Sequence, residues 1–238
     1  ESKVERKKAK LRKFIPSFPD DAVDLIPATA TPVEIIFDVT DNNGIADLNE
    51  ASLSIEYTKS GETTRSTTGI TGCTSIDAGN TRTYTCTVDM QFYDGAGAWT
   101  ASVSIDDNAG NTDSDTRPFT LNLLRDISLS PPTISFPTAL PGDVDIVSSA
   151  DTTVTNRGNF NVPADTQLQV TSKAFTGETN PAESISGNNF RAAGSSDAAT
   201  VCNAGGANLI QNTAVTIPNI ILPKGTDLTP ISTETLRY

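Results

Sequence analysis

The chain has 238 residues, enough for two domains of ordinary size, and a formal net charge of −12. It contains no histidine and three cysteines, which excludes histidine-dependent nucleophiles, histidine-ligated metals and a four-thiolate metal site. The acidic balance argues against nucleic acid as a partner, and no apolar run approaches the ~20 residues of a membrane span. We therefore expect a protein that is not an enzyme, has no membrane span and carries no resident cofactor.

The first 13 residues are basic, whereas the rest of the chain is acidic. Residues 1–13 hold seven Lys and Arg against two Glu, a net charge of +5. Residues 14–238 hold 10 basic and 27 acidic groups, a net charge of −17, and the two parts sum to −12. The composition of 4–13 is also compatible with a short helix. Such a charge contrast within one protein favours docking of the basic end on the acidic body of another copy.

Residues 14–32 follow this basic run and contain four prolines, which forbid a continuous helix and favour an extended path. We interpret 1–32 as an extended arm that adds a strand to a neighbouring subunit, rather than to its own domains. Binding to an anionic cell-surface polymer and a free solvated tail are the alternatives. The expected contact residues of the arm are Lys7, Lys8, Lys10, Arg12, Lys13, Phe14, Ile15, Phe18, Val23, Leu25 and Ile26.

From residue 33 the pattern becomes that of strands, with β-branched and aromatic residues in alternation. Short strands at a spacing of roughly ten residues, joined by polar turns, are typical of an antiparallel sandwich. Trp99, the single tryptophan, begins one of these strands and is expected to be a core anchor rather than a sugar-stacking platform. The strands expected in 33–125 are 33–39, 52–58, 81–90, 98–106 and 116–124.

The region 126–238 has weaker periodicity and more Ala, Gly and Asn, but a similar spacing of short segments. We expect a second sandwich there, so that the fold class is all-β with two antiparallel β-sandwich domains, 33–125 and 126–238, behind the arm 1–32. The motifs described next indicate that these sandwiches are Ig-like. The strands expected in the second region are 133–136, 144–155, 166–173, 187–193, 198–202, 213–221 and 232–238.

Several turn and core motifs carry a resemblance to a known class of proteins. They are FDVTDNNGIADL (37–48), GCTSIDAGNTRTYTCTVDM (72–90), FYDGAGAWTASVSIDDNAGN (92–111), TTVTNRGNFNVP (152–163) and IILPKGTDL (220–228). With these motifs the chain resembles the Ig-like and fibronectin-like modules of archaeal cell-surface proteins. The resemblance implies an all-β fold and an extracellular location at the cell surface.

The cysteines suggest one disulfide. Cys73 and Cys86 enclose 12 residues, and Cys86 lies in an alternating strand. We expect them to be bonded, which would indicate an oxidising, extracellular setting; the alternative is two buried thiols in a cytosolic protein. Cys202 remains either a buried free thiol or an intermolecular bridge.

Asp and Asn gather in two predicted turns. One turn holds Asp38, Asp41, Asn43 and Asp47, and the other holds Asp106, Asp107, Asn108, Asn111 and Asp113. Oxygen ligands of this kind suit Ca²⁺, but the spacing does not match a calcium-binding EF-hand loop. Because Asp and Asn also form turns by bonding their own backbone, we expect turns, with Ca²⁺ as the alternative. The candidate metal ligands are Asp41, Asn43, Asp106, Asn108 and Asp113.

These observations predict an extracellular structural protein, the self-assembling subunit of a cell-surface filament. Its main partner would be other copies of itself, joined head to tail by strand addition through the N-terminal segment, with cell-surface polymers as further partners. The alternatives are a surface-layer lattice subunit and an adhesin or Ca²⁺-dependent carbohydrate-binding module.

Overall fold

The computed structural model describes residues 10–16, 22–140, 142–194 and 206–238. The described chain is all-β, with mainly antiparallel strands and two short 3₁₀ turns, η1 (Ile45–Asp47) and η2 (Gly187–Asn189). None of the helices in this part of the chain has the length and apolar content to cross a membrane. The chain divides into two compact units, Glu1–Leu124 and Arg125–Tyr238. The predicted all-β fold class is therefore confirmed.

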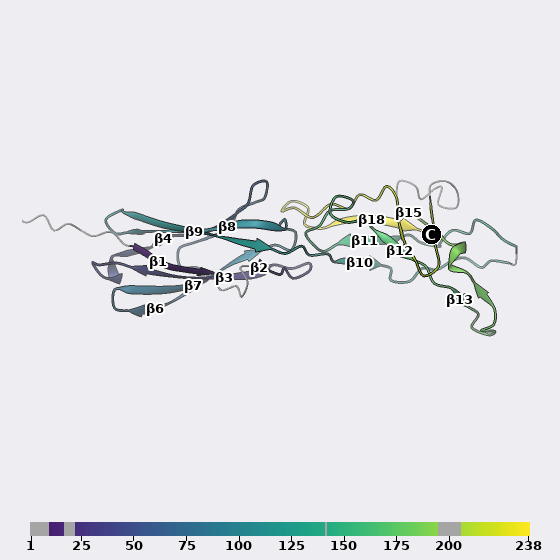
Figure 1. Ribbon diagram of the computed structural model, residues 1–238, viewed down its shortest axis with the longest axis horizontal. Coiled ribbons are helices and arrows are strands. Elements are labelled where there is room, and N and C mark those ends of the chain that lie inside the picture. The colour runs from purple at the N-terminus through teal and green to yellow at the C-terminus, as the bar shows by residue number, and fades with distance from the viewer. Residues whose placement is uncertain (1–9, 17–21, 141, 195–205) are drawn as a thin grey trace, which may run out of the picture. The chain divides into compact units, whose positions relative to one another are not determined.

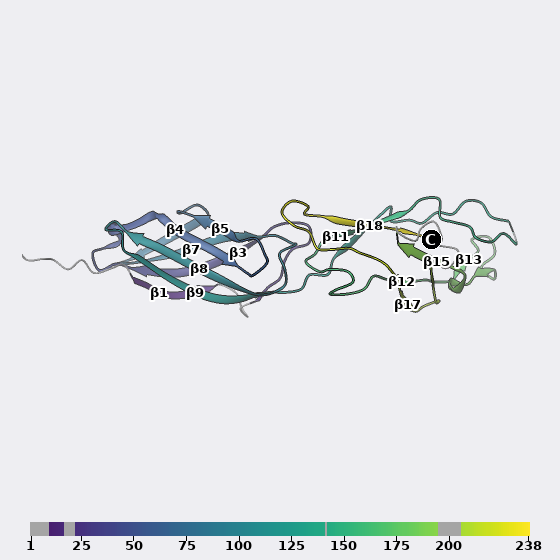
Figure 2. The same cartoon turned by 90° about the horizontal axis from the view of Figure 1, so that it is seen from above.

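The first unit contains two sheets (Figures 1 and 2). Neighbouring strands are antiparallel except for β2, which runs parallel to β9. The four-stranded sheet has the order β1 (Lys10–Pro16), β3 (Thr31–Thr40), β7 (Thr81–Met90) and β6 (Cys73–Ala78). The five-stranded sheet has the order β2 (Ala22–Val23), β9 (Thr112–Leu121), β8 (Gly97–Asp107), β4 (Leu48–Thr58) and β5 (Arg65–Thr68).

Both sheets of the first unit contribute to one hydrophobic core. In β3 every second residue is buried, because successive side chains of a strand point to opposite faces. The hydroxyl of Tyr57 on β4 donates to the carbonyl of Val33 on β3 at 3.3 Å, which joins the two layers. Large core side chains of the two sheets are Ile35, Phe37, Tyr84 and Met90 on the first and Ile55, Tyr57, Trp99 and Ile105 on the second. Trp99 is thus a core residue, as the sequence predicted.

The described part of the N-terminal segment forms strands, which corrects the helix considered for 4–13. β1 pairs with β3 from Lys10 opposite Thr40 to Pro16 opposite Ile35, so residues 10–13 are strand and not helix. Val23 and Leu25 are buried in the core of the same unit. Within this single chain, the described parts of the segment 1–32 therefore contact their own domain, because this pairing satisfies backbone amides and removes apolar side chains from water.

Among the other residues expected to make contacts from the arm, Ile26 is about half exposed. Lys7, Lys8 and Phe18 lie outside the described residues. The strand β1 includes the backbone of Arg12, Lys13, Phe14 and Ile15. Its pairing register with β3 shifts between Arg12 and Phe14. The described residues of this segment therefore include the strands β1 and β2 and the start of β3.

The main sheet of the second unit is built from shorter strands (Figure 1). Its five-stranded sheet has the order β10 (Ile127–Ser130), β11 (Thr152–Asn156), β18 (Ser232–Arg237), β15 (Arg191–Gly194) and β16 (Ala207–Asn208). Two further two-stranded sheets pair β12 (Gln169–Thr171) with β17 (Ala214–Thr216) and β13 (Phe175–Thr176) with β14 (Ser184–Ile185). The core of this unit includes Val154, Phe160, Val162, Ile217, Leu222 and Leu236.

Several strands expected in the second region are shorter or absent. Residues 133–136 form no strand. The strands expected at 144–155 and 213–221 are shortened to β11 and β17, and the one expected at 198–202 lies outside the described residues. Side chains replace part of the missing backbone pairing. Buried Asn156 donates from Nδ2 to the carbonyls of Phe160 at 2.8 Å and Pro223 at 3.0 Å. Hydrogen bonds of this kind hold segments that carry no strand periodicity, which is why alternation located them poorly.

Candidate functional site

The first candidate site is the edge of the four-stranded sheet. β1 is an edge strand, and within the described residues no other strand pairs with its outer side. It covers β3 from Ile35 to Thr40. Without β1, the backbone groups of β3 along this stretch would form an open edge, which is a template for pairing with another chain.

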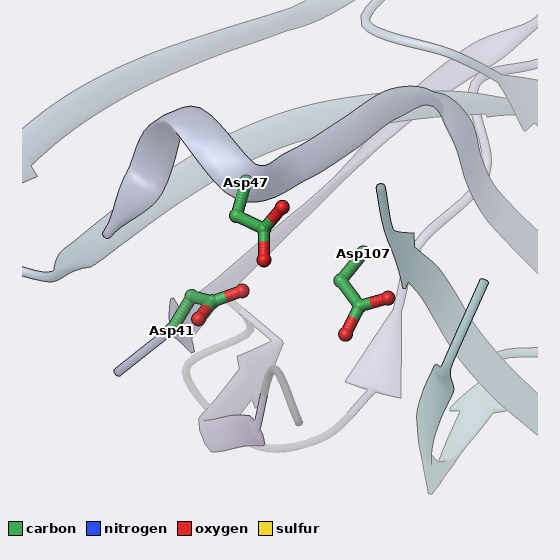
Figure 3. A group of neighbouring side chains, drawn as sticks. All are labelled: Asp41, Asp47 and Asp107. Atoms are coloured by element: carbon green, nitrogen blue, oxygen red, sulfur yellow. The ribbon is translucent and has the colours of Figure 1, made fainter. Parts of the chain in front are cut away.

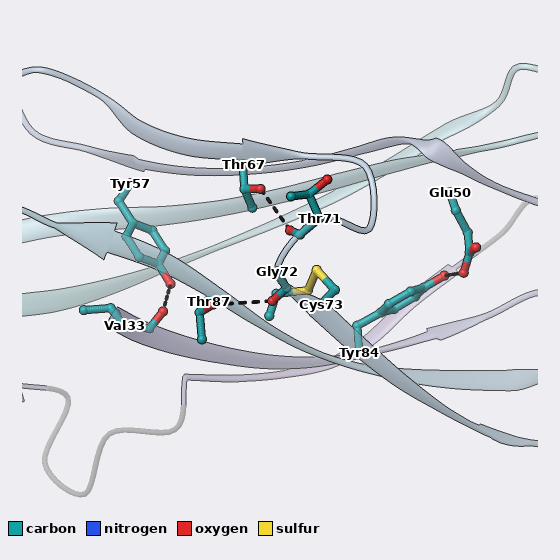
Figure 4. Close-up of a disulfide and its surroundings, with 10 residues drawn as sticks. Val33, Glu50, Tyr57, Thr67, Thr71, Gly72, Cys73, Tyr84 and Thr87 are labelled. Carbon is teal, nitrogen blue, oxygen red and sulfur yellow. Dashed lines mark hydrogen bonds between the residues drawn. A yellow bond between two sulfur atoms is a disulfide. The ribbon is translucent and has the colours of Figure 1, made fainter. Parts of the chain in front are cut away.

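The disulfide predicted from the sequence is present between Cys73 and Cys86. The two residues lie opposite each other on β6 and β7, and Cys86 is buried in the core. Figure 4 shows the disulfide at Cys73 and its surroundings. Gly72 precedes Cys73 with φ 73°, a conformation that a side chain disfavours, and its carbonyl accepts the N–H of Thr87 at 3.0 Å. The bond thus ties the edge strand β6 to the central strand β7. Cys202 lies outside the described residues.

The second candidate site is a cluster of three carboxylates at the loops that follow β3 and β8 (Figure 3). Asp41 comes directly after β3, Asp47 ends η1, and Asp107 is the last residue of β8. One side-chain oxygen from each lies within 4.8 Å of the others. Asp41 is 0 % and Asp107 is 1 % exposed, so two of the three carboxylates are out of contact with solvent.

Hydrogen bonds hold the first of these loops in shape. The N–H of Asn43 donates to Asp41 Oδ1 at 2.7 Å, and its side-chain Nδ2 donates to Asp47 Oδ2 at 3.2 Å. Gly44, with φ 103°, lets the chain enter η1. The Asp and Asn side chains here form turns with their own backbone, as the sequence favoured.

The second loop is held in the same way and contacts the first. Asp107 Oδ1 accepts the N–H groups of Ala109 at 2.9 Å and Asn111 at 2.8 Å. The N–H of Asn108 donates to the carbonyl of Asp47 at 2.7 Å, and its Nδ2 donates to the carbonyl of Ala46 at 3.2 Å. The two Asx-rich turns, about 60 residues apart in the chain, are therefore neighbours in space.

The candidate metal ligands separate into two groups. Asp41 belongs to the cluster, and Asn43 and Asn108 hydrogen-bond to its loops. Asp106 instead accepts the hydroxyl of Thr112 at 2.6 Å, and Asp113 accepts the N–H of Ser114 at 3.1 Å, so neither joins the cluster.

The sequence reasoning did not single out Asp47 and Asp107 as ligands. The sequence did contain a signal for Asp107. It lies an even number of residues from Trp99, Val103 and Ile105 on the same strand, so its side chain points into the core as theirs do. Asp106, one residue earlier, points to the opposite face. Asp47 lies on η1, where no such alternation applies.

Buried charged and phenolic groups of the first unit support the fold around these sites. Asp94 is 1 % exposed and pairs with Arg65 at 2.6 Å, which fixes β5 to the loop between β7 and β8. Burial raises the pKa of the Tyr57 phenol above its usual range and that of Tyr84 to about 12. The Tyr84 hydroxyl donates to Glu50 Oε1 at 3.0 Å (Figure 4).

Comparison with known proteins gives little further guidance. No family model matches the chain, and no curated protein matches it. Among solved structures, a DUF4466 family protein from Parabacteroides merdae is similar at 11 % sequence identity and a TM-score of 0.28, covering 96 % of this chain and 97 % of the other.

Proposed function

We propose that the protein is a non-enzymatic, extracellular structural protein, the subunit of a cell-surface filament built from Ig-like sandwiches. Subunits would join head to tail by strand addition through the N-terminal segment. The observation that carries this proposal is the position of β1, an N-terminal strand at the very edge of a sheet, paired to β3. A two-layer first unit with one shared core and an intrachain disulfide supports the sandwich and the oxidising location.

The pairing of β1 with β3 in one chain is compatible with the same pairing between chains. If β1 of one subunit pairs with β3 of the next, each backbone hydrogen bond lost within a chain is remade between chains. Exchange of an identical element is a low-cost route to association. Because the contact is head to tail, it need not close on itself and can generate a fibre.

Charge supports the same direction of assembly. The basic residues 1–13 carry +5 and the remainder carries −17, so the N-terminal end of one copy is attracted to the body of another. This attraction should weaken as salt rises, because the Debye length falls to about 10 Å at 0.1 M. The strand pairing itself should not depend on salt in this way.

The proposal is tested by a cysteine pair that reports which chain supplies β1. Lys10 and Thr40 are register partners, so Lys10→Cys with Thr40→Cys places two thiols within bonding reach. A Cys202→Ser background leaves only the native disulfide beside the new pair. In assembled material we expect a covalent ladder on a non-reducing gel, and the single variant Lys10→Cys should give none. Fibres that yield only monomers with an internal bond would overturn strand exchange.

A deletion provides the second arm of this test. The deletion should remove residues 1–21 and not 1–32, because Val23, Leu25 and Val33 belong to the core of the first unit. We expect that the shortened chain forms no filaments and that its circular dichroism remains that of a β-rich protein. Filaments formed by the shortened chain, or a planar lattice formed by the intact one, would contradict the proposed assembly.

A further inference from the structure

We propose that Asp41, Asp47 and Asp107 form a Ca²⁺ site that clamps together the two sheets of the first unit. The three carboxylates come from separate parts of the chain, and one oxygen from each lies within 4.8 Å of the others (Figure 3). Three like charges this close repel one another strongly when two of them are buried. A divalent cation between them would offset that repulsion. The inference stands independently of the proposed assembly.

A second observation points to a ligand rather than to a turn alone. Asp41 is fully buried, and its Oδ1 accepts the N–H of Asn43, but its Oδ2 is buried with no hydrogen-bond partner. Among the residues that the structure describes, neither Asp41 nor Asp47 forms an ion pair. A buried carboxylate oxygen without a partner costs free energy, and formation of the Asx turn does not require it. A metal ion would satisfy this oxygen.

The donors and their spacing suit Ca²⁺. All three are carboxylates, the oxygen ligands that hard cations prefer, and the chain has no histidine to favour a softer metal. Oxygens bound to Ca²⁺ at 2.3–2.6 Å can be about 5 Å apart across the ion, which accommodates the 4.8 Å limit of this cluster. Mg²⁺ requires oxygens at about 2.1 Å in a strict octahedron and dehydrates reluctantly, so a site that offers three carboxylates at this spacing suits it less well. Water would complete the coordination of Ca²⁺.

The placement of the ligands predicts what the ion does. Asp41 continues β3 of the four-stranded sheet, whereas Asp107 ends β8 of the five-stranded sheet. An ion bound to both would join the layers at one end of the core, and Asp47 would fix the loop between β3 and β4. Because such a ligand binds the folded state only, it stabilises the unit by an amount that grows with the logarithm of the Ca²⁺ concentration above Kd.

The test is a thermal unfolding experiment on the full chain after treatment with chelator, at constant ionic strength. Fluorescence of Trp99, the single tryptophan, reports the first unit alone because this residue lies in its core. At a Ca²⁺ concentration of 100 times Kd we expect the melting temperature to rise by about 10 °C. Isothermal titration should give one Ca²⁺ per chain. The same concentration of Mg²⁺ should give a much smaller rise.

Variants assign the effect to the cluster. Asp47→Asn and Asp41→Asn should each lose most of the Ca²⁺-dependent rise, while their melting temperature in chelator stays level or increases because repulsion is relieved. Asp115→Asn removes the same charge from an exposed position of β9 and should keep the full rise. Asp47 is only half-buried, so its variant remains informative if Asp41→Asn fails to fold. The proposal is overturned by no rise with millimolar Ca²⁺, an equal rise with Mg²⁺, or a full rise in Asp47→Asn.

Discussion

Removal of the Cys73–Cys86 bond should measurably weaken the first unit. The bond joins residues 13 apart in sequence, and the chain-entropy relation for closing a loop of this size gives about 3 kcal/mol. Replacing both residues by alanine also removes the sulfur of Cys86, which is completely buried beside Tyr84. That adds about 1 kcal/mol for lost packing. We expect Cys73→Ala with Cys86→Ala to lower the free energy of unfolding by about 4 kcal/mol in total.

Trp99 makes this measurable in a chain of two units. Because it is the only tryptophan and is 1 % exposed in the core of the first unit, its fluorescence in urea follows that unit alone. With a urea dependence of about 2 kcal/mol per molar, the midpoint should fall by about 2 M. Cys202→Ala is the matched control, since it removes a cysteine outside the bond, and its midpoint should stay at the wild-type value.

Reduction of the bond without substitution separates loop closure from packing. Mild reduction of the wild-type chain should lower the free energy of unfolding by about 3 kcal/mol, the loop-closure part alone, because both sulfurs remain in place. At the same urea dependence the midpoint should fall by about 1.5 M. A double-alanine variant within 1 kcal/mol of wild type would show that the bond does not limit the unfolded chain as assumed. Two free thiols in a peptide map of native protein would contradict the bond itself.

Two more outcomes follow from buried groups of the first unit. Burial raises the pKa of Tyr57 and raises that of Tyr84 to about 12, so the unfolded phenols ionise first and stability should be lost as pH rises from about 10 towards 12. Tyr84→Phe should flatten this loss in unfolding measured by Trp fluorescence, and an unchanged slope would refute the assignment. Asp94→Asn should lower the free energy of unfolding by about 3 kcal/mol, since it removes the buried carboxylate that pairs with Arg65. Exposed Asp115→Asn should lower it by less than about 0.5 kcal/mol, and equal effects would refute the difference.

The sequence by itself determined the strands that alternate. The strand expected at 81–90 is β7, that at 98–106 is β8 with one more residue at each end, and 33–39 is the middle of β3. In each, the face that a side chain occupies depends only on its place along the same strand, so a local pattern is enough. The Cys73–Cys86 bond was open to prediction for a similar reason, because both residues lie in one short stretch of chain.

Strands without that pattern were missed. β5 and β6 carry mostly exposed side chains, so no apolar alternation marks them. They are strands because their backbones find partners, β5 along β4 and β6 along β7. The short strands of the second unit are similar, since side-chain hydrogen bonds such as those of Asn156 take over part of the pairing there.

Only the tertiary structure decided which strand pairs with β1 and which carboxylates form the cluster. The sequence indicated that 1–32 favours an extended path with apolar content, but whether β1 pairs with its own β3 or with another chain depends on competition between identical contacts. Asp41 and Asp107 are 66 residues apart, and the Asx-rich turns offered nine side chains from which to choose. The fold brings β3 and β8 to the same end of one core, and strand parity turns Asp107 inward and Asp106 outward. Contacts between segments distant in sequence depend on how the sheets pack, and no local pattern encodes that.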